Sequence, residues 1–213
     1  MGVAVGTGSL LLSVALAAVW RPGPLKRLFA PPPVDGLNAR AGLDGRLLGH
    51  FPYGELPASK RVAIAAGFSL HRDAAEAFLE LQRDAATSGH ELIVLSAYRS
   101  HKLQNELFFD VKSDRNQSAR ERAMVSAPPG FSEHSTGFAI DLGDGLAPAT
   151  NLSPEFEQTP AFAWLKANAA RYHFTLSFPR GNSQGVSYEP WHWRFEGSAE
   201  ALQIFEPAQR LAR

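Results

Sequence analysis

The sequence contains no cysteine among its 213 residues. This absence excludes disulfide bonds, a catalytic thiolate and any zinc site with sulfur ligands. A metal ion in this protein must therefore be bound by histidine, aspartate or glutamate. The absence does not fix the compartment, although it suits an oxidising one, where free thiols are a liability.

An excess of charge of either sign is also missing. The 21 Lys and Arg residues balance 21 Asp and Glu residues, so the formal net charge is zero. Since no basic surplus is present, we expect no nucleic-acid partner. The composition, 45% hydrophobic and 20% charged, is that of a globular protein. The length predicts one folded domain plus appendages.

Only one long apolar run occurs, at the N-terminus, where Gly2 to Trp20 carry no charged side chain. A helix over this run is roughly 28 Å long, close to the ~30 Å hydrocarbon core of a bilayer. The run predicts a membrane anchor or a cleavable signal segment over residues 1–20, with a buried core helix as the alternative. The A-x-A pattern at residues 15–17 favours cleavage after export, whereas the basic residues just after the run favour a cytoplasmic domain. We expect export.

Prolines then predict a stiff extended spacer over residues 21–40, and the remainder, residues 41–213, reads as one α+β domain. Strands are predicted over residues 91–97, 137–143, 173–178 and 188–195. Helices are predicted over residues 71–89, 98–112 and 159–172, from Ser118 at a capping box, and after Ser198. Along the second of these helices, Leu103, Leu107 and Val111 recur every fourth residue. Because helices and strands do not strictly alternate, we predict a small mixed or antiparallel sheet flanked by helices.

The stretch SEHSTGFAID, residues 132–141, contains a histidine and an aspartate in an unusual setting. Asp141 lies in an otherwise apolar strand, where a carboxylate is costly to bury unless it is paired or binds a cation. Gly137 allows a turn between His134 and the strand, so both side chains can face one pocket. A lone histidine is more often structural, so this stretch alone leaves the choice open.

A second stretch, EPWHWR at residues 189–194, adds a carboxylate and another histidine. Pro190 cannot donate to a sheet ladder, so Glu189 is expected at a bend before the strand. Together with the first stretch, His192 completes a set of two histidines and one carboxylate. Such a set leaves a fourth position open for water, as in a catalytic zinc site. The alternative is a strand whose tryptophans pack in a core while its charges face water.

The stretch SAYRS, residues 96–100, ends a predicted strand and contains Arg99. This residue is either an ordinary surface arginine or a fixed positive charge aimed at a carbonyl oxygen or a terminal carboxylate.

In this order, SAYRS with Gln104, PPGFSEHSTGFAID and EPWHWRF resemble the VanY-type zinc D-alanyl-D-alanine carboxypeptidases. These are related in fold to the VanX-type dipeptidases and the Hedgehog signalling domain. The family pattern is S-x-H-x-x-G-x-A-x-D followed by E-x-W-H, and each signature position is present here. The resemblance covers roughly residues 45 to 197. Many relatives have Gln-Thr at the position of Ser135 and Thr136, a departure that affects no ligand.

The resemblance implies a Hedgehog/D,D-peptidase-like α+β fold, preceded in this chain by the N-terminal apolar helix. It also implies one zinc ion per chain and a role for seven residues. The implied zinc ligands are His134, Asp141 and His192, the general base is Glu189, the oxyanion is stabilised by Arg99, and the substrate's terminal residue lies near Gln104 and Ser132.

The implied reaction is removal of the C-terminal D-alanine from peptidoglycan stem peptides. Alternatives are L,D-carboxypeptidase or endopeptidase activity on the same substrate, and a non-catalytic zinc-containing module that binds the cell wall. We expect a monomer in the cell envelope, outside the cytoplasm. It would be anchored in the membrane through its N-terminal segment, or secreted after cleavage of that segment.

Overall fold

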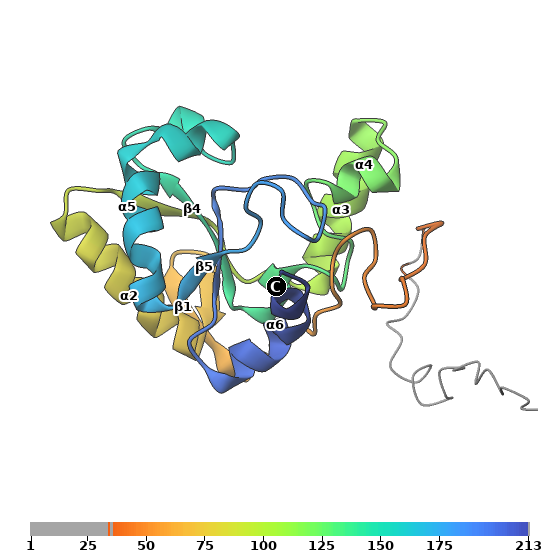
Figure 1. Cartoon of the computed structure of the whole chain (residues 1–213), viewed down its shortest axis with the longest axis horizontal. Helices are drawn as coiled ribbons and strands as arrows, with labels where there is room; N and C mark the ends of the chain where they lie inside the picture. The colour runs from red at the N-terminus through yellow and green to blue at the C-terminus, as the bar shows by residue number, and fades with distance from the viewer. Residues whose placement is uncertain (1–33, 35, 213) are drawn as a thin grey trace, which may run out of the picture. The chain divides into compact units, whose positions relative to one another are not determined.

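The computed structural model describes residue 34 and residues 36–212 (Figure 1). The apolar helix predicted over residues 1–20, and most of the spacer predicted over residues 21–40, lie outside these described residues. Within the described part of the chain, no helix combines the length and the apolar character that a membrane crossing requires.

The main sheet has four strands in the order β3-β4-β6-β5, and all neighbouring strands are antiparallel. The strands are β3 (Leu92–Ser96), β4 (Ala139–Asp144), β5 (Phe174–Leu176) and β6 (His192–Phe195). The α+β class with an antiparallel sheet is therefore confirmed. All six residues of the central strand β4 are buried, so a charged side chain on this strand has no direct access to bulk water.

The strand predicted over residues 188–195 is too long at its N-terminal end. β6 begins only at His192, because Pro190 has no N–H for the ladder and the chain turns there. In this turn the His192 N–H donates to the Glu189 carbonyl at 3.1 Å. Glu189 therefore lies at a bend before the strand, as expected.

A second, two-stranded sheet was not predicted from the sequence. It pairs β1 (Arg61–Ala65) with β2 (Phe68–His71) and leads directly into α2 (Arg72–Thr87). The ring of His71 caps the start of α2 by accepting from the Asp73 N–H. The helix predicted over residues 71–89 is thus confirmed, and its stripe of apolar residues is buried at Ala74, Ala75, Phe78, Leu81 and Ala85.

The other helices surround the main sheet. They are α3 (His101–Asp114), α4 (Ala119–Ala123), α5 (Pro160–Asn168) and α6 (Ala199–Ala212). Short 3-10 helices are η1 (Ala58–Lys60), η2 (Glu133–Thr136), η3 (Pro148–Thr150), η4 (Pro154–Gln158) and η5 (Ala169–Tyr172). Figure 1 shows α2 and α5 side by side, in contact with each other, and α3 with α4 at the opposite side of the domain. The helices close a core rich in phenylalanine, including Phe78, Phe138, Phe156 and Phe205.

The sequence signals at the helix starts are confirmed. Ser118 and Glu121 form the capping box of α4, and Thr159 caps α5 with proline in its first turn. The apolar repeat along α3 faces outward, however, because Leu103 is 44% and Leu107 38% exposed. α3 instead buries Phe108 and the polar Gln104.

Gly137 ends η2 in the left-handed region, with φ +71°. A Cβ at this position would clash with the Leu56 side chain and lie 2.9 Å from the His71 nitrogen. We therefore expect Gly137→Ala to lower the free energy of unfolding by more than the ~1–2 kcal/mol of a left-handed non-glycine residue. Chemical denaturation measures this change.

The matched control is Gly67→Ala, at φ +80° with nothing within 4 Å of the added Cβ. It carries the backbone strain without the clash. Equal losses in both variants would contradict a packing role for Gly137.

Candidate active site

Three elements deliver the side chains of the site: two that are adjacent in the sequence and one about fifty residues further along. η2 provides His134, β4 provides Asp141, and β6 provides His192 at its first position. The register of the β4–β6 pair sets Asp141 directly opposite His192. The left-handed turn at Gly137 brings η2 back beside the strand, so the three side chains meet.

These three residues form a candidate metal site. One ligand atom from each lies within 4.8 Å of the other two, and all three residues are buried. His134 Nε2 is 3.2 Å from Asp141 Oδ2, and His192 Nδ1 is 3.0 Å from Asp141 Oδ1. Ligand atoms ~2.0–2.2 Å from a tetrahedral zinc ion lie roughly 3.3–3.5 Å apart, so these spacings fit zinc after small adjustments.

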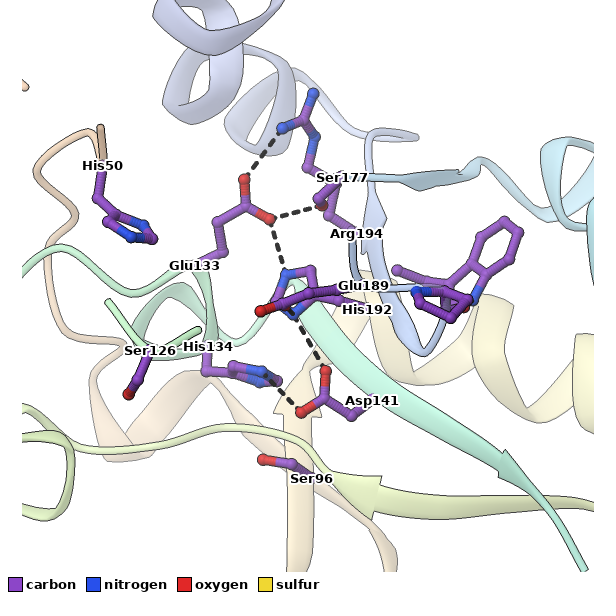
Figure 2. Close-up of polar contacts among 12 residues, drawn as sticks. His50, Ser96, Ser126, Glu133, His134, Asp141, Ser177, Glu189, His192 and Arg194 are labelled. Carbon is purple, nitrogen blue, oxygen red and sulfur yellow. Dashed lines mark hydrogen bonds and ion pairs between the residues drawn. The ribbon is translucent and has the colours of Figure 1, made fainter. Parts of the chain in front are cut away.

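The second nitrogen of each histidine is already engaged. His134 Nδ1 lies 2.8 Å from the Ala97 carbonyl oxygen. His192 Nε2 lies 3.0 Å from Glu133 Oε2 (Figure 2). When these nitrogens donate, the free lone pairs are on His134 Nε2 and His192 Nδ1, which both face Asp141. Such outer partners fix the tautomer and orientation of metal-binding histidines. The donor set and its supporting contacts thus fit a metal ion.

The charges of the three residues are strongly coupled. Burial opposes ionisation of Asp141, but His134 and His192 outweigh burial and hold the pKa of Asp141 well below its ordinary value. Burial lowers the pKa of His134, so this ring is neutral at pH 7. Burial also disfavours the charge on His192, but its hydrogen bonds to Asp141 and Glu133 raise its pKa to about 10 in the absence of metal, so a metal ion bound at Nδ1 would displace a proton.

Glu133 was not singled out in the sequence, yet it organises one side of the site. Its carboxylate accepts from Arg194 Nη1 at 3.0 Å and from Ser177 Oγ at 2.6 Å, besides its contact with His192. Burial opposes ionisation, but Arg194, followed by His192 and Ser177, lowers the pKa of Glu133 to about 2. Figure 2 shows the resulting chain from Arg194 through Glu133 and His192 to Asp141. The only signal in the sequence is an acidic residue next to His134.

Glu189 approaches the site from the bend before β6. Its Oε2 lies 3.9 Å from His192 Nδ1, and its side chain is 13% exposed. Burial raises the pKa of Glu189 to about 8; nearby Asp141 and Glu133 add to the rise, while His192 and Arg99 act against it. A carboxyl group with this pKa can both accept and release a proton near neutral pH.

Arg99 lies at the end of β3, on the other side of Asp141. Its Nη2 is 3.9 Å from Asp141 Oδ2 and donates to Ser96 Oγ at 2.8 Å. Its Nη1 donates to Gln104 Oε1 at 2.8 Å. Gln104 has no exposed surface, and its amide nitrogen donates to the Ala127 carbonyl at 2.6 Å. Gln104 thus fixes the guanidinium group from behind.

A single cavity of about 410 Å³ connects these groups. Six of the seven residues singled out in the sequence line it: Arg99, Ser132, His134, Asp141, Glu189 and His192. The seventh, Gln104, lies behind the wall. The sequence motifs therefore converge on one place in the fold.

A family model for VanY, described as D-alanyl-D-alanine carboxypeptidase, matches residues 67–198, more than half of the chain. The chain belongs to the VanY family. The six residues singled out in the sequence that line the cavity all lie within the matched segment. Among curated VanY-like proteins, the putative carboxypeptidase YodJ of Bacillus subtilis (strain 168) is 32% identical over 138 residues. The match covers 63% of this chain and 49% of YodJ, so the chain spans about half the length of this relative.

Two solved structures of VanY-like proteins resemble the domain. The LdcB LD-carboxypeptidase gives a TM-score of 0.56 at 29% identity, over 73% of this chain and 71% of LdcB. A mutant of the vancomycin-resistance D,D-pentapeptidase VanY from a VanB-type cassette, in complex with Zn(II), gives 0.57 at 22% identity. That match covers 76% of this chain and 94% of the other, and it shows the shared fold.

Proposed function

We propose that the chain is a zinc-dependent carboxypeptidase that removes the C-terminal D-alanine from peptidoglycan stem peptides. The observation that carries the proposal is one cavity in which a His-Asp-His set meets a partly buried glutamate and an arginine. Membership of the VanY family supports the choice of substrate. The products are free D-alanine and a peptide shortened by one residue.

His134, Asp141 and His192 hold one zinc ion per chain. Three protein ligands leave a position open, which is typical of catalytic rather than structural zinc sites. When bound, zinc supplies a Lewis acid that activates water and polarises a carbonyl group. The Zn(II) in the related VanY structure supports this choice of metal.

Glu189 is the general base. Its carboxylate takes a proton from the water that attacks the last peptide carbonyl, and returns that proton to the leaving amine. Arg99 provides a fixed positive charge beside Asp141 and stabilises the carbonyl oxygen as it becomes negative. Gln104, buried behind Arg99, holds the guanidinium group in place. Ser132, which lines the cavity, binds near the substrate's terminal residue.

The decisive experiment incubates the zinc-loaded chain with a stem pentapeptide, with a stem tetrapeptide and with a cross-linked peptide dimer, and identifies the products by mass. Release of one alanine from the pentapeptide alone supports the D,D-carboxypeptidase. Cleavage inside a cross-linked dimer but of neither monomer indicates an endopeptidase. Binding of the peptides without any cleavage indicates a non-catalytic module, although the presence of both Glu189 and Arg99 argues against one.

An L,D-carboxypeptidase is the second candidate. The observation that favours it is the 29% identity with the LdcB LD-carboxypeptidase. Release of alanine from the tetrapeptide alone would establish this activity.

The proposed reaction occurs in the cell envelope, outside the cytoplasm, because peptidoglycan is there. Residues 1–20 export or anchor the chain, residues 21–40 act as the spacer, and residues 41–213 form the carboxypeptidase domain, which acts as a monomer. Fractionation of cells that express the full chain, with N-terminal sequencing of the product, tests both the compartment and the cleavage.

Glu133→Gln tests the support that His192 receives. The substitution keeps the shape of the side chain but removes the charge that accepts from His192 Nε2. Outer partners of this kind contribute roughly 10–100-fold to metal affinity. We therefore expect a zinc affinity lower by about that factor, measured by competition with a chromogenic chelator.

The matched control is Glu196→Gln, because Glu196 also accepts from Arg194, at 2.6 Å, but is no partner of His192. We expect its zinc affinity to remain that of the unmodified protein. An unchanged affinity in Glu133→Gln, or an equal loss in both variants, would argue that Glu133 does not act through His192.

A further inference from the structure

Two arginines in the cavity have no part in the proposed reaction. Besides Arg99, Arg115 and Arg122 line the same cavity. Arg115 follows the last turn of α3, and Arg122 lies in α4. The cavity therefore has a histidine and carboxylate end at the candidate metal site and a cationic wall formed by α3 and α4.

Arg122 is buried without a full set of partners. It is 9% exposed, its Nη2 donates to the Leu107 carbonyl at 3.2 Å, and its buried Nε has no hydrogen-bond partner among the described residues. In that part of the chain, neither Arg115 nor Arg122 has a carboxylate oxygen within 4.0 Å of its guanidinium nitrogens. A buried charge without a counter-charge is costly.

The carboxylates in the same cavity are engaged elsewhere. Glu133 pairs with Arg194, Asp141 pairs with the two histidines, and Glu189 lies 3.9 Å from His192. Burial lowers the pKa of Arg122, and the charges of Arg115 and Arg99 lower it further, so the three guanidinium groups repel one another. An anion bound between them would relieve this repulsion.

A continuous polar wall connects Arg122 with the reaction centre. Arg99 donates to Gln104, and Gln104 Nε2 donates to Ser126 Oγ at 3.3 Å. The Ser126 N–H in turn donates to the Arg122 carbonyl at 3.0 Å. Arg122 thus lines the same cavity as Arg99 and the candidate metal site.

We propose that Arg115 and Arg122 form a subsite that binds a carboxylate group of the peptide substrate. The planar guanidinium fork matches a carboxylate in two parallel hydrogen bonds. The carboxylate is either the C-terminal one or that of an acidic side chain in the same peptide. The peptide nature of the ligand rests on the proposed function.

The test measures binding to the zinc-loaded Glu189→Gln protein, which keeps the peptide intact. Three probes are titrated by calorimetry: a stem pentapeptide, the same peptide as a C-terminal carboxamide, and the same peptide with its side-chain carboxylates amidated. Adding Arg122→Gln, and separately Arg115→Gln, should weaken binding of the unmodified peptide about tenfold, the scale of one charged hydrogen bond. Arg120→Gln, an exposed α4 residue outside the cavity, should leave binding unchanged.

The modified peptides identify the carboxylate. Suppose that the C-terminal carboxamide peptide binds about tenfold more weakly than the unmodified peptide, and that Arg122→Gln does not weaken its binding further. The bound group is then the C-terminal carboxylate. If the peptide with amidated side chains behaves in this way instead, the bound group is a side-chain carboxylate. An equal loss of affinity for all three peptides in the arginine variants, or no loss for any of them, overturns the subsite.

Arg115 is exposed, so its variant still tests the proposal if Arg122→Gln fails to fold. Arginine-dependent binding without alanine release by the unmodified enzyme would refute the proposed function but not the subsite.

Discussion

The Glu189→Gln protein is expected to bind zinc normally and to lose nearly all turnover. Glutamine keeps the size of the side chain but cannot accept the proton of the attacking water, and general base catalysis contributes about 10²–10⁴-fold. Glu189 is no member of the His-Asp-His set, so zinc content should stay at one ion per chain. The loss should therefore appear in kcat, with little change in KM.

Measurement of kcat and KM on the stem peptide, with metal content determined on the same preparation, checks this result. The control is Glu206→Gln, on the exposed side of α6, where the carboxylate lies 3.5 Å from Arg210. It should retain both zinc and activity. Full activity of a zinc-loaded Glu189→Gln enzyme would contradict the assignment of Glu189 as the general base.

The Asp141→Asn protein is expected to lose zinc itself, and activity with it. Asp141 is the charged member of the candidate site and contacts both histidines, at 3.2 Å and 3.0 Å. Asparagine is nearly isosteric but neutral, so it cannot balance the charge of a divalent ion. The loss in zinc affinity should exceed the roughly 10–100-fold contributed by an outer partner such as Glu133.

Asp144→Asn is the matched control on the same strand. Asp144 is also buried, but its Oδ1 accepts from the Leu146 N–H at 2.8 Å, away from the cavity, and asparagine can still accept this bond. We expect normal zinc affinity from this variant. If Asp141→Asn retained zinc with the affinity of the unmodified chain, then Asp141 would not be a ligand.

The helices could be predicted because the contacts that mark them join residues close together in the sequence. The cap at Thr159, the capping box at Ser118 and the apolar stripe of α2 each act within one turn of helix, so the sequence contains all the partners involved. The hairpin of β1 and β2 was missed because short strands have no such local marker. Its pairing and its contact with α2 are decided by packing.

α3 shows how tertiary context overrides periodicity. An apolar repeat usually marks the buried stripe of a helix. In α3, however, Leu107 lines the cavity and Leu103 is 44% exposed, whereas Gln104 is fully buried. Gln104 is buried because its amide satisfies Arg99 on one side and the Ala127 carbonyl on the other. A buried polar residue with such distant partners has no periodic signature.

The sequence by itself indicated the VanY family, an α+β fold with a mixed or antiparallel sheet, and the residues expected to form the metal site. It could do so because the absence of cysteine limits the donors to His, Asp and Glu, and because the motifs have characteristic spacings. Only the tertiary structure decided what surrounds these residues. The Glu133–Arg194 pair behind His192 joins residues 61 positions apart, and the contact of Arg122 with the Leu107 carbonyl joins residues 15 positions apart. Contacts between residues so far apart in the sequence are set by sheet register and helix packing, so they cannot be predicted from any single stretch of the chain.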